Sequence, residues 1–324
     1  MTASRVDLPA VTVFAVSSVV LAWLVALPLW LRGEGLTDIL LAPTAAAMMF
    51  TPALATVLAL LVQRRTRGRR GARAVLRELG MWPLRPARRT VGVAVAMIVA
   101  MPLILIVGLG VMARTGAVTL DLTDFSGFAQ ALQTGVPAGI ELPPVQLLVA
   151  LQLASIPLAA VINAPFAFGE EVGWRGWLLP ALRPLGTWPA LLVSGAFWGL
   201  WHAPLILLGY NFAEPNPLGV VLMIVACSLF GVILGWSRLR TASVWPAVFA
   251  HGAFNASAGV GVLLVAADSP VPSAAIAGPL GVMTWVVFAL AIGVLLVSGQ
   301  FRGDRLQAEL RPDPVRPAVA PVSG

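Results

Sequence analysis

Long apolar runs restrict the folds that are open to this sequence. Several of them exceed about 18 residues, the length at which an apolar stretch is a candidate transmembrane helix. Of the 324 residues, 59% are hydrophobic and only 11% are charged, against roughly 25% charged in a typical soluble domain. The sequence therefore predicts an all-α, polytopic membrane protein.

Apolar windows of about 20 residues predict eight transmembrane helices. The first, Leu8 to Leu31, is too long for a signal-peptide core and lacks a small-residue cleavage site after it, so we expect it to be retained. We predict one membrane domain over residues 1–301, with the site core at about 143–266, and a flexible, Pro-rich cytoplasmic tail over residues 302–324. The eight predicted spans are 8–31, 38–62, 91–113, 143–168, 188–209, 218–237, 244–266 and 279–299.

Arginine is distributed unevenly along the chain. The net charge of +7 comes from 21 Arg and no Lys, and ten of these Arg lie between Arg64 and Arg89. In a membrane protein such a basic loop sets topology and contacts anionic lipid, so we predict no nucleic-acid partner. We expect a multi-pass protein of the cell membrane with both termini in the cytoplasm. The loops predicted on the other side carry the acids Asp38, Asp121, Asp124, Glu141, Glu214 and Asp268.

Three charges lie beside the fourth span, in "FAFGEEVGWRGWLLP" (residues 166–180). A charge at the bilayer centre costs roughly 2.5–3.5 kcal/mol, so Glu170, Glu171 and Arg175 together would cost on the order of 8–10 kcal/mol without partners. Glu171 and Arg175 are four residues apart on one helix face and are predicted to form a structural ion pair. Glu170 points about 100° away from that face and needs another role.

Both histidines of the chain fall inside predicted spans, His202 in "FWGLWHAP" and His251 in "VFAHGAFNAS". Asn255 shares a helix face with His251 at a spacing of four. At about 1.5 Å per residue, Glu170 and His251 lie roughly 10–15 Å below the cytoplasmic face and His202 nearer 20 Å. Ionisable residues at membrane depth indicate function, and three helices that each contribute one indicate a shared interior site.

A carboxylate, two imidazoles and an amide can together activate water and stabilise an oxyanion. Glu170, His202 and His251 also form a three-ligand set of the kind that holds catalytic zinc, so zinc or another divalent metal is a candidate cofactor. The sequence has no HExxH motif, which leaves a metal-independent mechanism open. Cys227 has no His nearby in sequence, and we expect it to be a packing residue.

These residues form three motifs in a fixed order. The motifs are EExxxR at Glu170, Glu171 and Arg175, an FxxxH-type motif ending at His202, and HxxxN at His251 to Asn255. In this order the sequence resembles the CPBP family of intramembrane proteases, also called the ABI or CAAX protease family, which includes the type II CAAX prenyl endopeptidase. Trp198 stands where the second motif has Phe, and we expect this exchange to alter packing more than chemistry.

The resemblance implies a helical membrane endopeptidase that cuts near the cytoplasmic side of the bilayer. It implies that Glu170 and His202 activate water, that His251 and Asn255 stabilise the oxyanion, and that the ion pair holds the site together. Family members are classed as metalloproteases, although a metal-independent glutamate mechanism has been argued for some. The implied partner is a membrane-associated peptide or protein, prenylated or not.

Two other functions fit the same residues. A proton-coupled transporter could use buried Glu and His as a relay, and it would be expected to show inverted repeats, which we do not find in the sequence. A non-catalytic immunity or binding protein could share the fold and would keep its function without Glu170.

Overall fold

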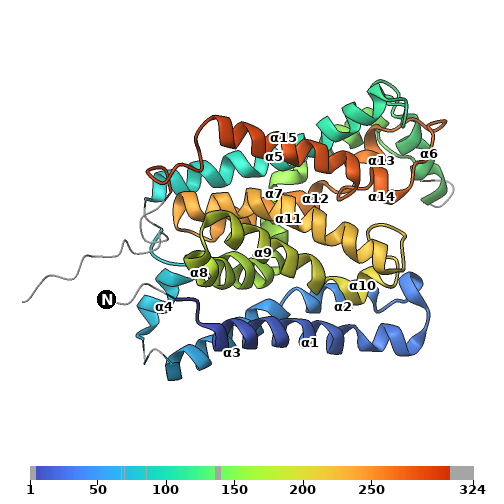
Figure 1. Ribbon diagram of the computed structural model, residues 1–324. Coiled ribbons are helices and arrows are strands. Elements are labelled where there is room, and N and C mark those ends of the chain that lie inside the picture. The colour runs from blue at the N-terminus through green and yellow to red at the C-terminus, as the bar shows by residue number, and fades with distance from the viewer. Residues whose placement is uncertain (1–4, 67, 69, 85, 136–139, 307–324) are drawn as a thin grey trace, which may run out of the picture.

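The computed structural model describes residues 5–66, 68, 70–84, 86–135 and 140–306, which form a bundle of helices (Figure 1). Within these residues the only β-type pairing is an isolated bridge between Leu120 and Val265, so the predicted all-α class is confirmed. Of the predicted tail, residues 307–324 lie outside the described residues. The elements are α1 (Leu8–Arg32), η1 (Gly35–Thr37), α2 (Leu41–Met48), α3 (Thr51–Thr66), α4 (Ala72–Glu78), α5 (Ala87–Arg114), α6 (Ser126–Gly135), α7 (Val145–Glu171), η2 (Val172–Leu178), α8 (Leu179–Leu182), η3 (Arg183–Leu185), α9 (Thr187–Trp201), α10 (Ala203–Ile206), α11 (Pro217–Thr241), α12 (Trp245–Ser257), α13 (Val260–Leu264), α14 (Ala274–Ala277) and α15 (Val282–Val297).

Six helical segments of the described chain are long and apolar enough to cross a membrane, by length and composition. They are Leu8–Arg32, Leu41–Thr66, Ala87–Arg114, Val145–Leu185, Pro217–Thr241 and Ala274–Val297. Each coincides with one of the eight predicted spans, and the chain is therefore a multi-pass membrane protein.

The other two predicted spans, 188–209 and 244–266, are broken into shorter helices. In the first, α9 ends at Trp201, His202 is its C-cap, and α10 follows with Pro204 in its first turn. In the second, α12 ends at Ser257 and α13 begins at Val260. The two interrupted passes carry both histidines of the chain.

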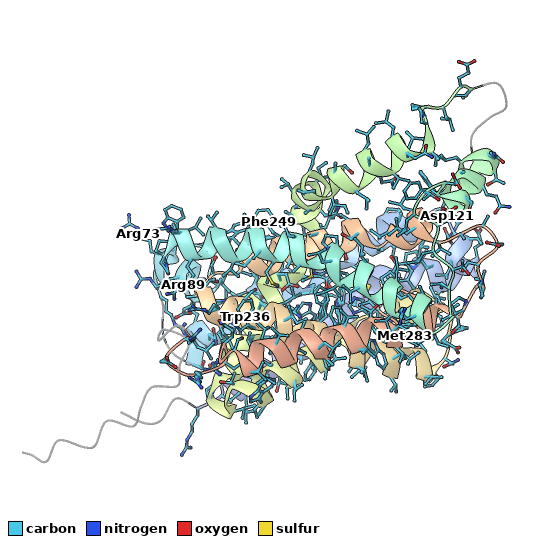
Figure 2. The ribbon with its side chains drawn as sticks, turned by 90° about the horizontal axis from the view of Figure 1, so that it is seen from above. Arg73, Arg89, Asp121, Trp236, Phe249 and Met283 are labelled. Atoms are coloured by element: carbon cyan, nitrogen blue, oxygen red, sulfur yellow. The ribbon has the colours of Figure 1, made fainter. Side chains whose placement is uncertain are left out.

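Opposite charges collect at the two ends of the bundle. In Figure 1, α4 lies at the end where the N-terminus is marked, whereas α6, α13 and α14 lie at the far end. Figure 2 likewise places Arg73 and Arg89 at one end and Asp121 and Met283 at the other. We call the end with α4 the Arg-rich end and the end with α6 the acidic end. The sorting of charged loops between two ends is the arrangement that the sequence predicted.

Close contact between neighbouring helices holds the centre of the bundle together. A Cβ atom on Gly199 of α9 would lie 2.4 Å from the Ile224 Cα of α11, and one on Gly195 would lie 2.7 Å from the Ser228 Cα. The backbones of α9 and α11 therefore touch at two turns, because glycines four residues apart leave room for the neighbouring helix. On the other side, a Cβ on Gly252 of α12 would lie 2.6 Å from the carbonyl oxygen of Ala160 of α7.

Gly199→Ala tests this contact. The added methyl group forces α9 and α11 apart, and overpacking of this kind costs about 1–3 kcal/mol. We expect a lower melting temperature in detergent, followed by tryptophan fluorescence. The control is Gly110→Ala on α5, where an added Cβ meets no atom within 4 Å. Equal melting temperatures for the two variants would show that the helices do not depend on this contact.

Candidate active site

The fourth span continues beyond its predicted end. After Glu171, α7 passes into the wide π-helical segment Val172–Leu178, and the helical path runs on to Leu185. π-Helical turns are rare and often occur at functional sites. The predicted span ended at residue 168, whereas the helical path ends at Leu185, so Glu170 lies further from the end of its span than predicted. The chain turns at Gly186, between the helical path that ends at Leu185 and α9, which begins at Thr187. Glu170 lies fifteen residues before Leu185, and His202 lies fifteen residues after Thr187. The two residues are therefore at similar depth in the bundle.

The predicted ion pair is present, and it has a third member. Arg175 NH1 donates to Glu171 Oε1 at 2.9 Å, with both side chains almost fully buried. The same oxygen is 2.9 Å from Nδ1 of His251 on α12. The Arg175 guanidinium also lies over the ring of Trp198 on α9, 4.1 Å from its centroid. Because a buried ion pair must recover the cost of desolvating two charges, these additional contacts support it.

Glu170, which the helix geometry left without a partner, accepts a hydrogen bond from Trp198. The indole Nε1–H of Trp198 donates to Glu170 Oε2 at 2.6 Å. The expectation that Trp198 changes packing more than chemistry is therefore wrong, because a phenylalanine has no such donor. Trp198 also lies between the two histidines, with ring centroids 5.9 Å from His202 and 5.4 Å from His251.

Both histidines are oriented in the same way. Nδ1 of His202 is 2.8 Å from the backbone carbonyl oxygen of Trp198, and Nδ1 of His251 faces the carboxylate of Glu171. Each acceptor requires an N–H at Nδ1, which fixes the ring and makes Nε2 the nitrogen that can act on a bound molecule. In both histidines the protein thus binds Nδ1 and leaves Nε2 available.

The four predicted site residues all line one cavity of about 310 Å³. It lies between α2, α7, α9, α11 and α12, and Glu170, His202, His251 and Asn255 all line it. Its volume falls in the range of small-molecule and cofactor sites. Most of the remaining lining is apolar, with Ala45, Met48, Met49, Trp198, Trp201, Leu205, Tyr210, Asn211, Met223, Cys227, Phe230, Phe254, Ala258, Pro279 and Leu280.

The three predicted metal ligands do not form a ready-made metal site. Among the residues that the structure describes, no three His, Cys, Asp or Glu side chains are grouped so that they could hold a metal ion. Glu170, His202 and His251 therefore share a cavity without forming the three-ligand arrangement of catalytic zinc.

Two contacts at the site join residues that are distant in sequence. Besides the contact between Glu171 and His251, the Cys227 sulfur lies 3.9 Å from Nδ1 of His202. Cys227 therefore has a histidine neighbour in space although none is nearby in sequence, and its thiol is buried, as we expect of a packing residue. The glycines Gly195 and Gly199 let α9 approach α11 closely on the same side of the site.

Comparison with known proteins finds a family resemblance for this part of the chain. The family model described as type II CAAX prenyl endopeptidase Rce1-like matches residues 150–257. This segment runs from α7 to α12 and includes Glu170, His202, His251 and Asn255. None of the curated proteins compared with the chain matches it. The predicted resemblance to the CPBP family is confirmed for residues 150–257.

Glu171→Gln tests the shared carboxylate. The substitution keeps the size of the side chain but leaves the Arg175 charge buried without its counterion, and breaking a buried pair costs about 3–5 kcal/mol. We expect a large loss of thermal stability in detergent. The matched control is Glu34→Gln, which removes an exposed acid paired with Arg32 at 3.0 Å and should leave the melting temperature unchanged. A Glu171→Gln protein as stable as its control would contradict the structural role.

Proposed function

We propose that the protein is an intramembrane endopeptidase that hydrolyses a peptide bond with water. One observation carries the proposal: a single cavity inside the bundle is lined by a carboxylate, two imidazoles and an amide that are 85 residues apart at most. The family match over residues 150–257 supports the same class of reaction.

Glu170 is the proposed general base. The indole of Trp198 occupies Oε2 and fixes the orientation of the carboxylate, so Oε1 is the oxygen that accepts a proton from water. His202 Nε2 orients the same water, because its Nδ1 is engaged by the backbone of α9. Water held between these two groups is directed at the carbon of the scissile amide.

His251 and Asn255 are the proposed oxyanion donors. They lie one helical turn apart on α12 and both line the cavity. Glu171 holds His251 through Nδ1, so a protonated ring presents Nε2–H to the cavity beside the Asn255 amide. Two donors aimed at the oxygen that gains charge stabilise the tetrahedral intermediate.

The apolar walls of the cavity favour a membrane-associated peptide as substrate. Met48, Met49, Phe230 and Phe254 provide surface for apolar side chains, while the polar groups gather around Glu170. An apolar wall with a few convergent polar groups is typical of sites that bind and orient a largely apolar ligand.

Glu170→Gln should abolish cleavage while the protein still inserts and folds, because the amide cannot accept the proton. The measurement compares peptides in membranes from cells that produce the wild-type or the variant protein. The control is Asp268→Asn, which changes an exposed acid of the acidic end and should leave the peptides unchanged. His202→Asn and His251→Asn should also lose cleavage. Identical peptides from the wild-type and Glu170→Gln proteins would reject the enzyme, and proton-coupled flux in proteoliposomes would then favour a transporter.

Trp198→Phe keeps a smaller aromatic ring and removes the N–H that holds Glu170. Hydrogen bonds to charged groups contribute about 1.5–3 kcal/mol, so we expect kcat to fall roughly ten- to hundredfold with little change in KM. Trp188→Phe is the same exchange at a surface position, where Trp188 packs against Phe301, and should leave kcat unchanged. Equal kcat values for the two variants would show that the indole does not position the base.

A further inference from the structure

The cavity reaches the surface at the acidic end of the bundle. Its outer lining comes from the loop after α10, with Tyr210 and Asn211, from Ala258 at the end of α12, and from Pro279 and Leu280 before α15. The start of α15 lies toward the acidic end in Figure 2, where both Met283 and Asp121 are labelled. Trp30, near the end of α1, donates its indole N–H to the Pro204 carbonyl at 3.0 Å, which ties α10 to the same end.

Exposure increases in the same direction. Glu170 and His251, the innermost groups, are only 3% and 5% exposed. Asn255, one turn further along α12, is exposed, and so is Ala258 at the end of that helix. The lining of the site is therefore most exposed toward the acidic end.

The Arg-rich end is closed by packed side chains. Behind the site, Arg175 and Trp174 are buried, and the fully buried Arg238 donates to the Arg175 carbonyl oxygen at 3.1 Å and to the Glu78 carbonyl oxygen at 2.6 Å. The Val244 N–H donates to the Gly80 carbonyl oxygen at 3.0 Å. These bonds join η2, α11 and the segment after α4 into a layer between the site and the Arg-rich end.

Charge decides how these two ends lie across the membrane. Loops rich in Arg remain in the cytoplasm, and most described Arg residues outside the bundle core lie at the closed end. The open end carries Arg32 and Arg114 against seven acids, Glu34, Asp38, Asp121, Asp124, Glu141, Glu214 and Asp268. By this charge rule the mouth of the cavity lies on the side away from the cytoplasm, whereas the resemblance implied cleavage near the cytoplasmic side.

We infer that the substrate enters from the extracytoplasmic side, and that it is an exported or membrane-inserted peptide segment and not a prenylated C-terminal tail. This inference rests on the proposed function. A prenyl group is attached to the Cys of a C-terminal CaaX sequence, and such a tail is presented to the membrane from the cytoplasm. The closed layer of Arg175, Trp174 and Arg238 lies between a cytoplasmic tail and Glu170.

Thiol labelling tests the side of the mouth independently of catalysis. The background is Cys227→Ala, because Cys227 is the one cysteine of the chain and lines the cavity. In this background Ala258→Cys places a thiol at the mouth, and Asp268→Cys places a second one on an exposed loop of the same end. Arg73→Cys on α4 is the matched reporter for the Arg-rich end.

Right-side-out membrane vesicles are treated with a membrane-impermeant sulfonated maleimide. We expect Ala258→Cys and Asp268→Cys to be labelled at once, and Arg73→Cys only after the vesicles are permeabilised. Labelling in the opposite pattern would overturn the inference, and the Asp268→Cys reporter decides the case if Ala258→Cys does not fold.

Cleavage separates this inference from the proposed function. A bulky polyethylene-glycol maleimide attached to Ala258→Cys from outside should block the release of the peptides that depend on Glu170. If Ala258→Cys is labelled only after permeabilisation while Glu170→Gln still abolishes cleavage, the enzyme stands and extracytoplasmic entry fails. If labelling occurs from outside but Glu170→Gln changes no peptide, the enzyme fails and the substrate class fails with it.

Discussion

One buried carboxylate oxygen joins the three helices of the site. Glu171 Oε1 binds the Arg175 guanidinium in the π-helical turn and Nδ1 of His251 on α12, and Arg175 in turn lies over Trp198 of α9. Charges at this depth are tolerated only when each has partners, so the same contacts that neutralise the ions also fix the helices relative to one another. Loss of this oxygen would disturb the fold and the orientation of His251 together.

Trp198 connects that structural pair to the reactive groups. Its indole N–H holds Glu170, its carbonyl oxygen holds His202, and its ring face receives Arg175. Glu170, His202 and His251 are therefore each oriented by a neighbouring group of the protein, as side chains are in preorganised sites. The close approach of α9 and α11 at Gly199 makes room for this arrangement.

The bundle is closed at its Arg-rich end and open at its acidic end. At the Arg-rich end, Arg238 and the backbone bonds around Gly80 close the protein behind the site. At the acidic end, the interruption between α12 and α13 and the loop after α10 leave the cavity open. Short, broken helices are tolerated in a membrane protein where they border a polar cavity, because their freed backbone groups find partners there.

The sequence alone determined six of the eight predicted spans, the sorting of charged loops and the pair of Glu171 with Arg175, because these depend on hydrophobic length and on spacing within one helix. It also identified four of the residues that line the cavity, Glu170, His202, His251 and Asn255. Only the tertiary structure decided that Trp198 donates to Glu170, that Glu171 holds His251, and that the cavity opens at the acidic end. These contacts join residues 28 and 80 positions apart, so they arise from how glycine-lined helices pack against one another, which no local pattern specifies.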